Sequence, residues 1–137
     1  MPKQYIAFSC PKPDNHFHYS EFAIKASNGI TTSEIKFYTP SDFFKEFGTQ
    51  LLDFPKSVKD EVVLHIKEPY ANIKLRAYCH TPLGHCAIEV IFDNEEAAPK
   101  TMRCEFHILT IPGSVNRLGD RLKKWDFLNE EITWLPE

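Results

Sequence analysis

The stretch ANIKLRAYCHTPLGHCAIEVIF, residues 71–92, has the pattern of two strands joined by a tight turn. With the turn centred between Pro82 and Leu83, apolar residues face one another along one side of the hairpin. These facing pairs are Ile73 with Phe92, Leu75 with Val90, Ala77 with Ile88 and Cys79 with Cys86. A shift of one residue would set apolar positions against polar ones along the ladder. Because Pro82 and Gly84 are also typical turn residues, the stretch predicts an antiparallel hairpin with one buried side.

The opposite side of the hairpin carries polar and aromatic residues. Its facing pairs are Lys74 with Ile91, Arg76 with Glu89, Tyr78 with Ala87 and His80 with His85. Facing residues share one side of a sheet, so we expect Cys79 and Cys86 to point to the core and the two histidines away from it. A Cys2His2 zinc site needs all four ligands around one ion, and none is predicted here. The cysteines are interpreted as small buried side chains, with a cross-strand disulfide as the alternative.

The segments that precede this hairpin predict another hairpin and a helix. FAIKASNGITTSEIKFYT, residues 22–39, alternates apolar and polar positions around Asn28-Gly29, a pair typical of two-residue turns. TPSDFFKEFGTQLLDFP, residues 39–55, changes to helical spacing, with Thr39 as the expected cap and Asp42 completing a capping box. Its expected apolar stripe consists of Phe43, Phe44, Phe47 and Leu51. Gly48 within this helix suggests close packing against a neighbour.

The remaining elements complete an α+β pattern. Strands are expected at residues 62–66 and 102–109, and a second helix at residues 114–125, capped by Ser114. Its expected buried face consists of Val115, Leu118, Leu122 and Trp125. The tail EEITWLPE either forms a short strand or docks as a terminal segment. Because the strands are grouped in runs, we predict one antiparallel sheet of about six to seven strands with two helices packed on one face, in a single domain spanning residues 1–137.

Composition narrows the class of protein. The chain has 137 residues, a net charge of -3 and 42% hydrophobic residues, with 11 phenylalanines that suggest an aromatic core. The weakly acidic balance disfavours a nucleic-acid binder, which normally shows a basic stripe. No apolar run approaches the roughly 20 residues of a membrane helix, and MPKQYIAFSC lacks the apolar core of a signal peptide. We therefore expect a cytoplasmic protein whose four cysteines are free thiols, without nucleic-acid or membrane partners.

Sequence motifs of known catalytic chemistry are absent. The chain contains no GxxxxGK(S/T), GxGxxG, GxSxG, HExxH or CxxC pattern. Cys104 and His107 are three positions apart, which places them on opposite faces of a strand. Asp93, Glu95 and Glu96 cluster in DNEEAAP, where solvated loop acids are the usual interpretation. The sequence accordingly predicts a non-enzyme without a cofactor or a metal ion.

Four segments carry a family resemblance: SDFFKEFGTQL, ANIKLRAY, GHCAIEVIF and CEFHILTIPGSVNRLGDRL. In order and character, the stretch from Pro40 to Trp125 resembles a group of small bacterial proteins associated with polymorphic-toxin immunity loci. The resemblance implies a binding module that protects a cell by blocking a toxin domain. It supplies no catalytic residues.

Candidate contact residues follow from this hypothesis. They are Arg76, Tyr78, His80 and His85 on the open sheet face, Trp134 in the tail, and Glu95 and Glu96, which would complement a basic nuclease. The alternative interpretation of Trp134 is that it docks the C-terminal segment onto the rest of the protein. The histidines, with His107 as a further member, have two alternatives: solvated side chains, or acid–base groups or metal ligands of a small-ligand site. His16 and His18 are interpreted as solvated loop residues, and a homodimer through the open face is a third possibility.

Overall fold

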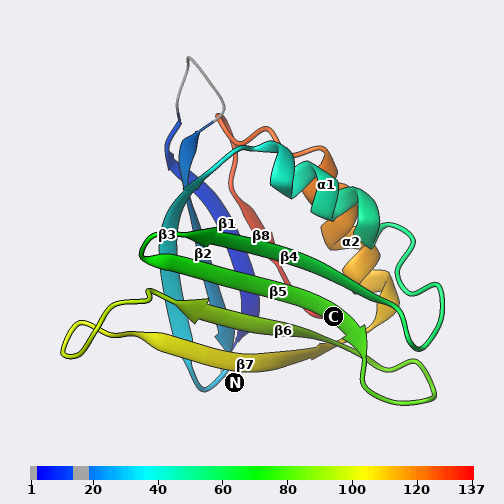
Figure 1. Ribbon diagram of the computed structural model, residues 1–137. Helices are drawn as coiled ribbons and strands as arrows, with labels where there is room; N and C mark the ends of the chain where they lie inside the picture. Colours follow the sequence, from blue (N-terminus) through cyan, green and yellow to red (C-terminus); the bar gives the residue numbers. More distant parts are fainter. Residues whose placement is uncertain (1–2, 14–18) are drawn as a thin grey trace.

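Two antiparallel sheets and two helices make up the computed structural model, which describes residues 3–13 and 19–137. The first sheet contains, in spatial order, β3 (Thr32–Thr39), β2 (Ser20–Asn28), β1 (Gln4–Lys12) and β8 (Ile132–Trp134). The second contains β4 (Glu61–Glu68), β5 (Ala71–Cys79), β6 (Cys86–Asp93) and β7 (Arg103–Thr110). The helices are α1 (Asp42–Leu51) and α2 (Pro112–Lys123). The strands of the two sheets cross, and the helices lie at the open side between them (Figure 1).

The α+β class with antiparallel pairing is confirmed, but the prediction of one sheet is wrong. After β3 the chain enters α1, so β4 starts a separate sheet whose inner face lies against β3. The short strand β8 then returns to pair with β1. Most strands bury one face, although β2 and β6 inside their sheets also bury residues of the outer face. This alternation is the same whether the strands form one sheet or two. The apolar pattern therefore predicted the strands and their buried sides, but not their division into two sheets.

The central hairpin has the predicted register. β5 and β6 pair Ile73 with Phe92, Leu75 with Val90, Ala77 with Ile88 and Cys79 with Cys86. All eight side chains except that of Cys79 are buried. Gly84 adopts a φ of 87° in the turn, a conformation that favours glycine. The matched apolar pairs explain this register, because a slip would turn them toward solvent.

The earlier hairpin differs from its prediction in the turn. β2 and β3 pair through Ser27 and Thr32, so the loop is longer than the two residues expected from Asn28-Gly29. The Asn28 Oδ1 atom accepts hydrogen bonds from the backbone N–H groups of Ile30 and Thr31 at 2.9 and 2.8 Å. The asparagine thus stabilises a wider loop through its side chain.

An aromatic cluster joins the helices to the first sheet. Phe44 of α1 lies against Phe22 and Trp125, with ring centroids 4.8 and 5.4 Å apart, and meets Phe8 edge-on at 6.1 Å. These four side chains belong to one core cluster that also includes the inner faces of both sheets. Eight of the eleven phenylalanines of the sequence belong to this core cluster.

The two helices pack at a pair of glycines. A Cβ atom on Gly48 would lie 2.7 Å from the Gly119 carbonyl oxygen, and one on Gly119 would lie 2.6 Å from the Gly48 oxygen. The close packing expected at Gly48 is therefore confirmed. Asn116 extends the contact, since its Nδ2 group donates to the carbonyls of Leu51 and Phe54 at 2.9 and 2.8 Å. The Leu51 carbonyl also accepts from Phe54 N–H at 3.3 Å, so Asn116 ties both the end of α1 and the segment after it to α2.

Both predicted helix caps are wrong. Ser41 and Ile111 occupy the N-cap positions, and neither forms a side-chain capping bond. Thr39 is instead the last residue of β3, and Ser114 is buried inside α2. Phe43 is 39% exposed and does not belong to the buried stripe, which consists of Phe44, Phe47 and Leu51 with Gly48. The N-cap of α1 lies two residues after the predicted Thr39, because β3 extends through Thr39, and the N-cap of α2 lies three residues before the predicted Ser114.

Candidate functional site

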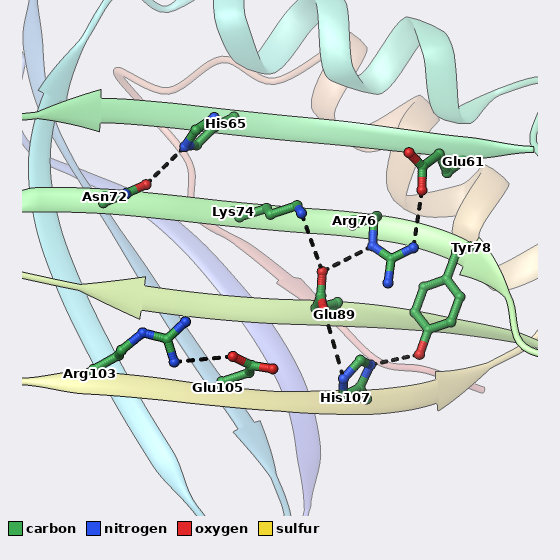
Figure 2. Close-up of polar contacts among 10 residues, drawn as sticks. All are labelled: Glu61, His65, Asn72, Lys74, Arg76, Tyr78, Glu89, Arg103, Glu105 and His107. Atoms are coloured by element: carbon green, nitrogen blue, oxygen red, sulfur yellow. Dashed lines mark hydrogen bonds and ion pairs between the residues drawn. The ribbon is translucent and has the colours of Figure 1, made fainter.

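The outer face of the second sheet carries a network of polar side chains, which we call the polar face. It consists of Glu61, His65, Asn72, Lys74, Arg76, Tyr78, Glu89, Arg103, Glu105 and His107, contributed by all four strands (Figure 2). They share this face because each stands at the outward position of its strand, opposite the buried alternation. No described helix or strand lies over the polar face (Figure 1).

Glu89 lies at the centre of the polar face and is only 8% exposed. Its carboxylate accepts a hydrogen bond from Arg76 Nε at 2.9 Å, with Lys74 Nζ at 3.8 Å and His107 Nε2 at 3.9 Å. Burial by itself would raise the pKa of Glu89. The hydrogen bond and the positive charge of Arg76, together with Lys74 and His107, outweigh burial and hold this pKa below its usual value. Glu89 is therefore an anion fixed among cations.

Arg76 is held from three sides. Besides Glu89, its Nη1 group donates to Glu61 Oε2 at 3.0 Å, and its guanidinium lies 4.1 Å from the centroid of the Tyr78 ring. The hydrogen bond to Glu89, which outweighs the opposing effect of burial, raises the pKa of Arg76. The arginine is thus presented in one orientation on the surface, stacked on an aromatic ring.

Tyr78 and His107 form the other half of the network. The Tyr78 hydroxyl lies 2.7 Å from His107 Nδ1, and the two rings meet edge-on at 5.7 Å. If Nδ1 carries the proton, it donates to the hydroxyl and leaves the Nε2 lone pair directed toward Glu89; in the other tautomer the hydroxyl donates. Either tautomer bonds to Tyr78, whereas only a protonated Nε2 extends the chain of contacts to Glu89.

A second set of contacts extends the polar face toward the loop after β6. His65 Nε2 lies 2.9 Å from Asn72 Oδ1, and Asn72 Nδ2 donates to Glu95 at 2.9 Å. The predicted contact residue Glu95 is thereby attached to this face. Glu96 bonds within its own loop, where Asn94 Nδ2 lies 3.5 Å from its carboxylate. Of the two predicted acids, the structure joins only Glu95 to the polar face.

His80 and His85 stand apart from this network. They are exposed beside the turn, with ring centroids 6.2 Å apart, and His85 Nδ1 lies 3.1 Å from Thr81 Oγ1. Within the described chain, no hydrogen bond or ion pair links them to Arg76, Tyr78 or His107. The predicted patch thus divides into the polar face and a histidine pair beyond the strand ends. His16 and His18 lie outside the described residues.

The cysteines are on the opposite side of the sheet, as expected. Cys79 Sγ and Cys86 Sγ are 3.9 Å apart, and both belong to or pack against the core. Burial raises the pKa of Cys86 to about 12, with a contribution from Cys79. All four cysteines are free thiols. The sheet therefore separates Cys79 and Cys86 from the two turn histidines.

Trp134 is not a surface residue, and its proposed role as a contact anchor is wrong. It is 1% exposed, and its Nε1 group donates to the Ser114 carbonyl at 2.9 Å. The strand β8 pairs with β1 through Ile6 and Trp134. The alternative interpretation, in which this tryptophan docks the C-terminal segment, agrees with the structure.

Three side chains of the polar face could hold a metal ion. Glu89, Glu105 and His107 each place one potential ligand atom within 4.8 Å of the others. A neutral His107 that donates Nδ1–H to Tyr78 would have the arrangement common to metal-bound histidines. Lys74 and Arg76 beside Glu89, and Arg103 at 3.1 Å from Glu105, oppose a cation here. Two surface hollows of about 340 and 300 Å³ lie elsewhere, at residues 9–11 with 127–131 and 36–38 with 68–71.

Several residues of the polar face were not selected from the sequence. The partners of Glu61, Lys74 and Glu89 all lie on strands that are consecutive in the chain. The contacts of Glu61 with Arg76 and of Glu89 with His107, however, depend on the registers of β4 with β5 and of β6 with β7, which the sequence pattern did not predict. The pairing of Arg76 with Glu89 was available from the hairpin register and was the one usable signal. No family model, curated protein or solved structure matches the chain. Neither described helix has the length and apolar character needed to cross a bilayer.

Proposed function

We propose that this protein is a non-catalytic binding module that docks a protein partner on its polar face, and that the partner is a toxin domain which it blocks. The observation that carries the proposal is the fixed Arg76–Tyr78 pair on an open sheet. Arginine and tyrosine are frequent hot spots of protein interfaces. Because Glu89, Glu61 and His107 already hold this pair, little side-chain entropy remains to be lost on binding.

The size of the face is compatible with this role. Four strands spaced about 4.8 Å apart and eight residues long at about 3.3 Å each span roughly 500 Å² before side-chain relief is counted. A standard interface buries about 800 Å² per partner, so side chains and flanking loops such as the one bearing Glu95 would complete it. The resemblance to toxin-immunity proteins supports a toxin as the partner. The carboxylate of Glu95 at the margin, whose partner Asn72 is neutral, suits a basic one.

The test is a comparative capture from lysate of the native host, read by quantitative mass spectrometry. The baits are the wild type, an Arg76→Ala/Tyr78→Ala variant, and a control with Lys25→Ala/Lys36→Ala on the exposed face of the first sheet. We expect the C-terminal domain of a large secreted protein with the wild type and the control, and its loss with the polar-face variant. A partner that all three baits retain equally, or none at all, would refute the proposal.

A metal-binding function is the second candidate, favoured by the geometry of Glu89, Glu105 and His107. It ranks lower because Lys74, Arg76 and Arg103 already neutralise both carboxylates. Titration calorimetry with Zn²⁺ and Mn²⁺ distinguishes the two candidates. A metal site predicts saturable binding that His107→Ala abolishes and His80→Ala leaves intact. Absence of saturable heat would eliminate it.

A further inference from the structure

The outer edge of β7 presents backbone groups in a regular array. Residues of an antiparallel pair alternate between those that exchange hydrogen bonds and those that do not. His80 N–H donates to the His85 carbonyl at 2.8 Å, so the odd-numbered residues of β6 bond to β5. The even-numbered residues of β6 consequently bond to β7. The bond from Asn94 N–H to the Met102 carbonyl, at 3.0 Å, follows the same alternation.

The odd-numbered residues of β7 therefore direct their N–H and C=O groups away from the sheet. These residues are Arg103, Glu105, His107 and Leu109. In the described part of the chain, β7 pairs with β6 alone, and no other residue bonds to these backbone groups. An edge with free donors and acceptors is a template for another strand.

Nothing in β7 blocks such pairing. Its register with β6 runs from Asp93–Arg103 to Cys86–Thr110 without a bulge, and the strand contains no proline. Leu109 is 64% exposed on this strand. In Figure 1, β7 forms the outer border of the second sheet, with no described strand or helix alongside.

The other sheet edges are flanked by other parts of the chain. The free side of β4 faces α1. On β8, Arg121 Nη1 donates to the Thr133 carbonyl at 2.7 Å. Beside β3, the turn between β4 and β5 lines the same hollow as residues 36–38, with Tyr70 68% exposed there. A strand approaching β3 would meet this turn, whereas β7 is open along its length.

We propose that β7 pairs antiparallel with β7 of a second copy of this chain, about a two-fold axis at Phe106. All four outward residues of each strand then face outward residues of the other, so their backbone groups form hydrogen bonds. In this register Glu105 faces His107 of the second copy, and Arg103 faces Leu109. Moving the axis to residue 105 or 107 would set Glu105 against Glu105 or His107 against His107, which is less favourable. The β4–β7 sheets of the two copies then form one continuous sheet, with the polar face of each copy on the same side.

Sedimentation velocity of the full chain tests the dimer, which is independent of the proposed function. We expect the mass to rise with concentration toward twice the 15.9 kDa of one chain. Proline is tolerated on an edge strand where its missing N–H faced solvent, so Glu105→Pro should keep the fold by circular dichroism and sediment as a monomer. Lys36→Pro, at the equivalent outward position of β3, is the matched control and should still dimerise. A wild type that stays monomeric, or a dimer lost only with Lys36→Pro, would overturn the proposal.

Cross-linking tests the register and does not depend on the proline variant folding. Chains carrying Glu105→Cys are mixed with chains carrying His107→Cys and oxidised, with the native cysteines as background. The axis at Phe106 predicts a disulfide between the two different chains and little with either variant alone. Efficient cross-linking of Glu105→Cys or His107→Cys with itself would place the axis elsewhere and contradict the proposed pairing.

Discussion

Replacing Glu89 with glutamine removes the charge around which the polar face is organised. Glutamine keeps the shape and an acceptor oxygen but loses the charge-assisted bond from Arg76 Nε, 2.9 Å long and centred on a carboxylate that is 8% exposed. Such a bond contributes about 2 kcal/mol. The pair with Lys74, at 3.8 Å and with a lysine 39% exposed, adds at most about 0.5 kcal/mol. We expect the free energy of unfolding to fall by about 2–2.5 kcal/mol.

Thermal unfolding followed by circular dichroism at neutral pH measures this loss. A chain of 137 residues loses about 3–4 °C in Tm per kcal/mol, so Glu89→Gln should lower Tm by about 7–9 °C. The matched control is Glu61→Gln, which removes the other carboxylate bonded to Arg76, at 3.0 Å but 54% exposed. Water replaces that bond, so the control should lose less than about 3 °C. Equal losses in the two variants would refute the argument that burial of Glu89 makes its ion pair the stronger one.

Three further predictions concern the same structure. Lowering the pH below about 4.5 should reduce the stability difference between wild type and Glu89→Gln. The folded pKa of Glu89 is lowered, so its carboxylate stabilises the fold at pH values above its ordinary pKa and loses that contribution as it becomes protonated. Urea titrations at several pH values measure this difference, and a constant difference would contradict the prediction. Gly48→Ala should destabilise by about 1–2 kcal/mol, since overpacking at the helix crossing exceeds the gain in helix propensity, whereas Gly113→Ala, with open space around its Cβ position, should not. Asn116→Ala should lower stability by about 1–3 kcal/mol in the same assay by removing the amide donor from the Leu51 and Phe54 carbonyls, and an unchanged midpoint would show that water replaces the amide.

The sequence predicted local features well because they depend on neighbours in the chain. The register of β5 with β6 followed from matching four apolar pairs across one turn, and Gly48 signalled the helix crossing. The division into two sheets depends on which strands meet in space, and the alternation of apolar and polar residues along a strand does not indicate this. Trp134 illustrates the difference: its burial needs β8 to lie beside β1, more than a hundred residues away in the chain.

The polar face was predictable only in part for the same reason. The hairpin pattern placed Arg76 opposite Glu89 and Tyr78 on the same side. Arg76 and Tyr78 are held in place by Glu61 on β4 and by His107 on β7. The first contact requires the register of β4 with β5, and the second requires that of β6 with β7. His80 and His85 lie close to Tyr78 in sequence, but His85 bonds to Thr81 of the turn and the His80 ring lies beside that of His85. The types of side chain indicated which face is polar, whereas the contacts between those side chains depend on the pairing of all four strands.

Hydroxyl-radical footprinting with the captured partner tests the central claim most directly. Oxidation of Tyr78 on the polar face is compared with that of Tyr38, 49% exposed on β3, in the free protein and in the complex. Docking on the polar face predicts that Tyr78 and His107 become protected while Tyr38 is oxidised as before. Protection of Tyr38 with unchanged labelling of Tyr78 and His107 would show that the partner binds the first sheet, and the account of the polar face as the binding surface would be wrong.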